Sequence, residues 1–264
     1  MKTILLLVHD DPGQEARLQV ALDLVRALEG HLTCLDVATF PLVAADFYGV
    51  GAAALVAEDR SAETANRARL EARLAHEDVS WSMIEATGEL APTVRQAAGL
   101  ADMVITDRHD DGGFLPTIGG TIEEIILTSG RPVLAVPRTV RGIDLSGRAL
   151  VCWDGSAPAQ AALHASVPLL KLAAEVELLQ ILDRTVTAPA EGAAAYLARY
   201  GITARIIRRS KAAHVASAIL AEAGQGHAYV VMGGFSHSRL REALFGGVTR
   251  TMLQQCPVPL LLAH

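Results

Sequence analysis

Cysteine, aromatic residues and long apolar runs are all scarce in this chain of 264 residues. The three cysteines, Cys34, Cys152 and Cys256, lie far apart and show neither metal-ligand spacing nor a disulfide framework, so we expect buried thiols in a reducing compartment. No apolar stretch is long enough to span a membrane, and the first apolar run ends at residues 9–11, too soon for a signal peptide. We therefore expect a cytoplasmic protein without a membrane partner.

An excess of positive charge is also lacking. The chain has 23 Lys and Arg against 29 Asp and Glu, a net charge of -6, which argues against non-specific binding to nucleic acid. No Gly-x-Gly-x-x-Gly follows the first strand and no Gly-Lys-Ser/Thr P-loop occurs, so dinucleotide and P-loop folds are disfavoured. His237 stands between Ser236 and Ser238 without a visible carboxylate partner, which disfavours a Ser–His hydrolase.

Apolar residues, mainly Ala and Leu, make up 51% of the chain. Their spacing predicts buried strands that alternate with amphipathic helices. The strands are expected at 3–8, 31–37, 79–84, 102–106, 132–136, 148–153, 176–182, 203–208, 229–232 and 258–262. The helices are expected at 14–28, 57–75, 91–100, 121–128, 158–172, 190–199, 212–223 and 248–255. Strands that alternate with helices predict parallel sheets with right-handed crossovers.

The pattern occurs twice, with a linker at Pro137–Gly147 between the copies. In both copies a Gly-Gly pair ends twelve residues before the proline of the fifth strand: Gly119-Gly120 before Pro132, and Gly246-Gly247 before Pro259. A repeat of this kind implies duplication. The sequence thus predicts an α/β protein of two tandem doubly wound five-stranded parallel sheets with helices on both faces, in domains 1–140 and 147–264. Because a free apolar edge strand invites pairing, we expect the fifth strands to pair into an intramolecular pseudo-dimer, and two chains can pair further into a homodimer.

Two sequence features of the second copy converge on one crevice. In such a sheet, ligands bind at the carboxyl ends of the strands where strand order reverses, here strands one and four. Those ends carry Asp154-Gly155-Ser156 and Met232-Gly233 to Ser236, and Gly246-Gly247 precedes the helix that starts at Val248. Glycine and the free N–H groups of a helix start suit a phosphate. The alternative is an ordinary strand–loop–helix turn with glycine for steric reasons.

These residues resemble the universal stress protein family. Val151-Cys152-Trp153-Asp154-Gly155-Ser156 matches its first strand, and Gly233, Ser236, Gly246 and Gly247 follow the spacing Gly-2x-Gly-9x-Gly-Ser/Thr of its nucleotide-binding members. The resemblance covers the whole second copy and, more weakly, the first. It implies an adenine-nucleotide alpha-hydrolase-like fold and an adenine nucleotide, ATP or AMP, with Mg²⁺ as a candidate companion. The implied contacts are Asp154 at the ribose and adenine end, Cys152, Ile181 and Met232 around adenine, and Gly233, Ser236, Gly246, Gly247 and Val248 near the phosphates.

Two residues depart from the family pattern. Ser236 replaces the second glycine, and a serine at a position that needs positive φ costs about 1–2 kcal/mol. Gly247 replaces the Ser/Thr, and the lost hydroxyl–phosphate hydrogen bond costs about 1.5–3 kcal/mol, or about ten- to a hundredfold in affinity. Three neighbouring side chains are candidates to compensate: Ser238, Arg239 and Thr249.

The first copy departs further. Asp107, Asp110 and Asp111 stand where phosphate-facing glycines would be, and carboxylates repel a phosphate without a metal between them. His109 with these acids could bind a cation, although a solvated charged loop is favoured. Asp10 or Asp11 remains at the end of strand one, so we interpret this copy as degenerate for nucleotide and mainly structural.

For two further stretches we favour a structural interpretation over a ligand-binding one. We interpret the basic run Arg205, Arg208, Arg209 and Lys211 as a solvated strand edge, with phosphate steering as the lesser alternative. We interpret 39–56 as a packed loop rather than a flap over a site.

The sequence leaves three hypotheses for the function. The first is a nucleotide-responsive stress factor with ligand in the second copy only, and the second is a ligand-independent scaffold with a vestigial loop and an unknown protein partner. Weak ATP hydrolysis is the third, disfavoured because the Ser-Gly-Gly loop of related ATP pyrophosphatases is missing.

Overall fold

The computed structural model describes residues 1–38, 63–108, 122–182, 186, 188–210, 214–235 and 247–264. Its strands are β1 Thr3–Val8, β2 His31–Ala38, β3 Ser80–Thr87, β4 Met103–Asp107, β5 Val133–Val136, β6 Arg148–Cys152, β7 Glu175–Leu182, β8 Ala204–Ser210, β9 His227–Gly233 and β10 Leu260–Ala263. Its helices are α1 Gln14–Leu28, an unlabelled helix over 63–74, α4 Leu90–Ala97 with the short 3-10 helix Ala98–Leu100, α5 Ile122–Thr128, α6 Ala157–Leu170, α7 Ala190–Ala198, α8 Val215–Ala223 and α10 Val248–Gln255.

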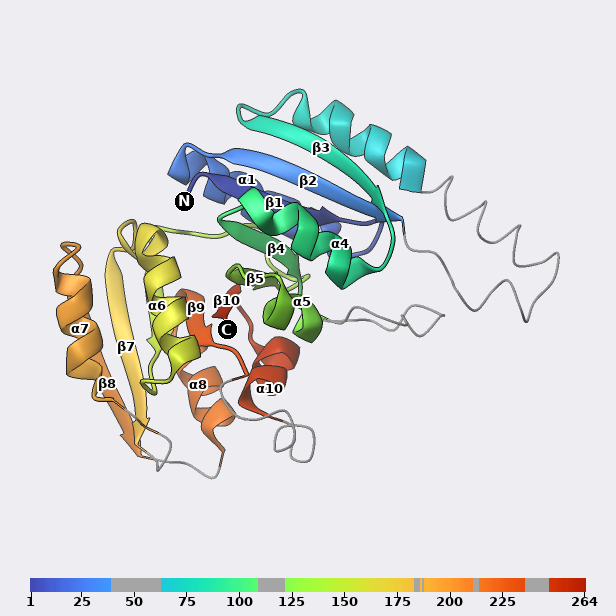
Figure 1. Cartoon of the computed structure of the whole chain (residues 1–264). Helices are drawn as coiled ribbons and strands as arrows, with labels where there is room; N and C mark the ends of the chain where they lie inside the picture. Colours follow the sequence, from blue (N-terminus) through green and yellow to red (C-terminus); the bar gives the residue numbers. More distant parts are fainter. Residues whose placement is uncertain (39–62, 109–121, 183–185, 187, 211–213, 236–246) are drawn as a thin grey trace, which may run out of the picture.

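The strands form a single sheet in the order β3-β2-β1-β4-β5-β10-β9-β6-β7-β8. Within each half the strands pair in parallel, and the halves meet where β5 pairs with β10 in the antiparallel sense, Leu134 opposite Leu261. The predicted pairing of the two fifth strands is confirmed, and it joins the two five-stranded sheets into one. Figure 1 shows this join at the centre of the molecule, with β3 and β8 at its two outer edges.

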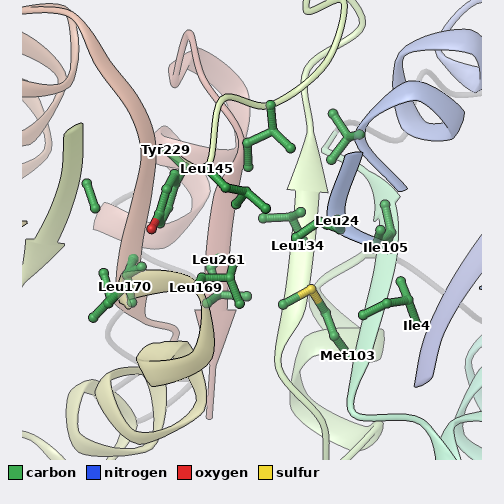
Figure 2. Packing of buried hydrophobic residues seen from close by; sticks show 14 of the residues in the cluster. Ile4, Leu24, Met103, Ile105, Leu134, Leu145, Leu169, Leu170, Tyr229 and Leu261 are labelled. Carbon is green, nitrogen blue, oxygen red and sulfur yellow. The ribbon is translucent and has the colours of Figure 1, made fainter. Parts of the chain in front are cut away.

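Helices cover both faces of the sheet, and each face has its own apolar core. One core packs α1, α6 and α7 against the sheet, and the other packs α4, α5, α8 and α10 against the opposite face. Figure 2 shows the first core crossing the join, with Leu134 of β5 facing Leu261 of β10 and Met103 and Tyr229 on either side. Both cores contain residues from both halves, so the halves are stabilised together.

Two details of α1 differ from what the sequence suggests. Asp10-Asp11-Pro12 reads as a capping aspartate before a proline, but the N-cap is Gly13, and Asp11 Oδ1 accepts its N–H at 2.6 Å. Gly30 reads as the helix stop, but the left-handed residue is Glu29, with φ 49°. Gly30 is needed for space, because a Cβ there would lie 2.7 Å from the carbonyl oxygen of Lys2.

Among the described residues, no helix has the length and apolar composition needed to cross a membrane.

Candidate functional site

The crevice that the sequence predicts lies at the carboxyl ends of β6 and β9. These strands are neighbours in the sheet, with Val151 of β6 opposite Val231 of β9. From β6 the chain goes on to α6 on one face, and β9 leads toward α10 on the other, so strand order reverses between them. A reversal of this kind leaves an opening above the sheet edge, which is where ligands of doubly wound sheets bind.

The turn after β6 places Asp154 at this edge of the sheet. Asp154 Oδ1 accepts the N–H of Ser156 at 2.9 Å, and Ser156 caps α6 by accepting the N–H of Ala159 at 3.3 Å. Gly155 between them has φ 81°, a conformation that favours glycine. Gln160 of the first turn of α6 donates to the Gly155 carbonyl at 2.8 Å. The Asp-Gly-Ser sequence is therefore a rigid turn that fixes the carboxylate.

The predicted adenine-contacting residues come together on one side. Ile181 and Met232 belong to the apolar core on the α8 and α10 face, and Cys152 and Val248 pack against that same core. Cys152 and Met232 each follow the paired residues Val151 and Val231, so they lie side by side at the sheet edge. Burial raises the pKa of the Cys152 thiol, which makes it a poor nucleophile at neutral pH.

The start of α10 presents backbone amides that have no helical hydrogen-bond acceptor. Gly247 is the N-cap, and the first helical hydrogen bond there runs from Thr251 N–H to the Gly247 carbonyl at 3.1 Å, so the amides before Thr251 lack a helical acceptor. Buried Thr249 ties this helix start to β9, because its Oγ1 accepts the N–H of Phe235 at 3.1 Å. Phe235 has φ 54°, so this hydrogen bond supports a left-handed backbone.

Of the two motif glycines that the structure describes, one has a structural reason that needs no ligand. A Cβ on Gly233 would lie 2.5 Å from the backbone nitrogen of Ala159, because β9 ends directly beneath the first turn of α6. Gly247 has φ -53°, a value open to any residue. The steric alternative therefore accounts for Gly233 and leaves Gly247 without a conformational requirement.

Several residues of interest lie outside the part of the chain that the structure describes. These are the site residues Ser236 and Gly246, the neighbouring His237, Ser238 and Arg239, the acidic-loop residues His109, Asp110 and Asp111, the segment 39–56, and Lys211 of the basic run.

The corresponding crevice of the first half is filled by the chain itself. Arg17 of α1 is only 2% exposed, and its guanidinium binds Asp11 through both terminal nitrogens, at 3.0 and 2.5 Å. The same guanidinium lies 3.5 Å from Asp107 at the end of β4, and Arg138 of the linker lies 3.2 Å from Asp107. Burial works to raise the pKa of the Asp11 carboxyl, but the hydrogen bonds and charge of Arg17 outweigh burial and lower it.

Arg17 is the residue that sequence reasoning misses. It sits beside the apolar stripe of α1, where an arginine is normally solvated, and its partner Asp107 is 90 residues away in the chain. The interpretation of this copy as degenerate for nucleotide stays a prediction. The internal ion pairs show that Asp107 is held by arginines within the fold.

The basic run on β8 is neutralised in the same way. Arg205 pairs with Glu175 and Glu177, Arg208 with Glu191, and Arg209 with Glu222. Each of these arginines has a carboxylate partner, so the run is a salt-bridged strand edge.

Two other features bear on ligands. A shallow depression of about 470 Å³ lies near the carboxyl ends of β7 and β8 at the start of α7, lined by Gln180, Val186, Ala188, Pro189, Glu191 and Arg208; it is separate from the crevice residues named above. Among the described residues, no group of three or more His, Cys, Asp or Glu is placed to hold a metal ion.

Comparison with known proteins agrees with the fold. The model of the universal stress protein family matches residues 1–137, just over half of the chain. A universal stress protein from Archaeoglobus fulgidus DSM 4304 is 15% identical, with a TM-score of 0.73 over 99% of this chain and 97% of that one. A protein of unknown function from Pseudomonas aeruginosa PAO1 is 18% identical, with a TM-score of 0.62 over 99% and 92% of the two chains. No curated protein matches in sequence.

The family match covers the half whose β4 loop carries aspartates in place of glycines. The match therefore supports the family and fold of the chain. It does not include the glycine loop of the second half.

Proposed function

The chain belongs to the universal stress protein family, and from that premise we propose that its C-terminal domain, 147–264, binds an adenine nucleotide, ATP or AMP, while its N-terminal domain, 1–140, does not. The base lies against Cys152, Ile181 and Met232, and the ribose lies at Asp154. The phosphates meet the loop and helix start, formed by Gly233, Ser236, Gly246, Gly247 and Val248, with Mg²⁺ as their companion ion.

One observation carries this asymmetry between the halves. In the N-terminal half the buried Arg17 guanidinium occupies the crevice and bonds Asp11, so an incoming phosphate or ribose would have to displace a buried ion pair. The whole of α6, the helix that corresponds to α1, contains no arginine or lysine. In the C-terminal half, the position that Arg17 holds in α1 therefore has no counterpart cation in α6.

The test is calorimetric titration of the full chain with ATP and with AMP. Wild type is expected to bind, and Asp154→Ala is expected to bind about ten- to a hundredfold more weakly, because a charge-assisted hydrogen bond is lost. The matched control is Asp10→Ala, which removes an exposed acid from the corresponding strand end of the N-terminal half. Its affinity should equal that of wild type. Equal affinity of wild type and Asp154→Ala would exclude this crevice as the site.

A ligand-independent scaffold is the second candidate, and a specific observation favours it. Gly233 is required by the packing of β9 under α6 whether or not a phosphate binds. A glycine kept for sterics can persist in a loop that has lost its ligand. Absence of heat with millimolar ATP and AMP in wild type would select the scaffold.

The wider proposal is a cytoplasmic, stress-responsive factor that responds to nucleotide rather than converting it. Incubation with ATP and Mg²⁺, followed by chromatography of the nucleotides, separates binding from turnover. Binding without formation of ADP or AMP is expected; product above a buffer blank would indicate an enzyme instead. Sedimentation of the same samples reports whether two chains associate into a homodimer.

A further inference from the structure

The end of β4 connects the two halves through two consecutive residues. Asp107 is held inside the N-terminal half, where its Oδ2 lies 3.2 Å from Arg138 Nε and 3.5 Å from Arg17 Nη1. Its Oδ1 accepts the backbone N–H of Arg108 at 2.6 Å. The filled crevice of the N-terminal half therefore fixes the backbone from which the Arg108 side chain extends.

Arg108 reaches across to the C-terminal half. Its Nη1 donates a hydrogen bond to the carbonyl oxygen of Cys256, which is the C-cap of α10. The carboxyl end of a helix carries partial negative charge and unpaired carbonyl groups, so a guanidinium placed there is favourable. The helix whose amino end faces the candidate phosphate site is thus held at its other end by an arginine of the opposite half.

A second group of contacts lies along the same side. Arg250 of α10 pairs with Glu123 of α5 at 3.6 Å, and a Cβ on Gly234 would lie 3.3 Å from Ile126 of α5. Figure 1 shows α5 next to α10 below the centre of the sheet. Both Gly234, which directly follows β9, and α10 therefore lie against α5 of the N-terminal half.

We infer that Arg108 is a positioning residue for the phosphate end of the C-terminal crevice. It holds α10 so that the amino end of the helix points at the crevice, and it does so from a backbone anchored by Asp107 and Arg17. The filled N-terminal crevice is then the support on which the other crevice depends. The expected effect of Arg108 on nucleotide affinity rests on the proposed function. Its expected effect on the position of α10 rests on the geometry alone.

The test compares Arg108→Ala with Arg131→Ala in the full chain. Arg131 is a matched control, because its guanidinium also donates to carbonyl groups at a helix end, those of Ala98 at 3.2 Å and Gly99 at 2.6 Å, but within the N-terminal half. Two quantities are measured: ATP affinity by calorimetry, and amide hydrogen exchange of peptides covering 248–256.

For Arg108→Ala we expect ATP affinity to fall about two- to fivefold and the amides of α10 to exchange about two- to fivefold faster, the size of a helix-terminal charge interaction. Arg108→Lys should restore most of both, because an ammonium can also donate to the Cys256 carbonyl. Arg131→Ala should change neither quantity. Unchanged exchange across α10 in Arg108→Ala would overturn the inference, and so would equal loss in Arg131→Ala.

The two proposals fail in different ways. If wild type binds no ATP, the proposed function fails, but the exchange rates still decide whether Arg108 holds α10. If wild type binds ATP and Arg108→Ala exchanges faster without losing affinity, the role in the nucleotide site is overturned while nucleotide binding itself stands.

Discussion

Glu177 and His227 are fully buried, and Glu177 Oε2 lies 2.8 Å from His227 Nε2. They come from β7 and β9, and Arg148 of the intervening strand β6 donates to the other carboxylate oxygen at 2.9 Å. Arg205 of β8 binds that same oxygen. One carboxylate thus joins four neighbouring strands near their amino ends, at the edge of the sheet opposite the candidate site.

This cluster predicts acid sensitivity. Burial alone would raise the pKa of the Glu177 carboxyl, but hydrogen bonds from Arg148, Arg205 and His227 outweigh it and lower the pKa from 4.5 to about 2. A lowered carboxyl pKa contributes stability that is complete above 4.5 and is lost as pH falls from 4.5 toward 2. Urea unfolding of wild type at several pH values should show the free energy of unfolding falling across that window.

The variant Glu177→Gln isolates the contribution. At pH 7 it should cost about 1.5–3 kcal/mol of unfolding free energy, because Arg148, Arg205 and His227 lose the charged acceptor that they share. Its own pH dependence below 4.5 should be flatter. Glu191→Gln is the control, since that carboxylate is exposed and pairs with Arg208 on the surface; its stability should stay close to wild type. If the free energy of unfolding of Glu177→Gln fell as steeply with acid as that of wild type, other carboxylates would be the cause of the acid sensitivity.

The filled N-terminal crevice predicts a large effect of Arg17→Met. Asp11 and Asp107 would remain at the crevice without the buried guanidinium, so we expect a loss of about 3–5 kcal/mol. Arg69→Met removes an arginine paired with exposed Asp10 and should be nearly neutral. Equilibrium urea unfolding measures both variants, and similar stabilities for the two would show that the Arg17 ion pairs contribute little.

Gly233→Ala tests whether that glycine is kept for packing. The new methyl group would meet the backbone at Ala159 and Pro158, at 2.5 and 2.7 Å, so we expect a cost of about 1–3 kcal/mol in thermal or urea unfolding. Gly192→Ala in α7 has nothing within 4 Å of its added Cβ and should stabilise the protein by about 0.5–1 kcal/mol. A neutral Gly233→Ala would mean that α6 can move away from β9.

Thr249→Val removes the acceptor for the Phe235 N–H while keeping the side-chain shape. A buried amide without its partner costs about 1–3 kcal/mol, and the left-handed backbone at Phe235 loses its support. We expect lower stability and weaker ATP binding together. Thr249→Ser keeps the hydroxyl and should bind ATP as wild type does. Calorimetry and thermal unfolding compare the three proteins. If Thr249→Val bound ATP as tightly as wild type, the Thr249–Phe235 hydrogen bond would have no part in nucleotide binding.

The sheet topology was predictable because it depends on local patterns. Continuous apolar runs such as Thr3–Val8 and the shared fifth-strand motif before Pro132 and Pro259 indicate the strands and the repeat, and an apolar edge strand predicts the β5–β10 pairing. The convergence of Cys152, Ile181 and Met232 follows from the topology. Two long-range contacts did not follow, because the Arg17–Asp107 ion pair and the Arg108–Cys256 hydrogen bond join residues 90 and 148 positions apart, and no periodicity in the sequence relates them.

The antiparallel join of β5 and β10 has a consequence for how the two halves can diverge. In a dimer of identical chains every substitution appears twice, on both sides of the symmetry axis. Here both sides belong to one polypeptide, so α1 can place Arg17 in one crevice while the corresponding helix α6 contributes no arginine or lysine to the other. The covalent link also keeps the partners together at any protein concentration, since their association is intramolecular. The duplication therefore permits a division of labour that a symmetric assembly cannot encode.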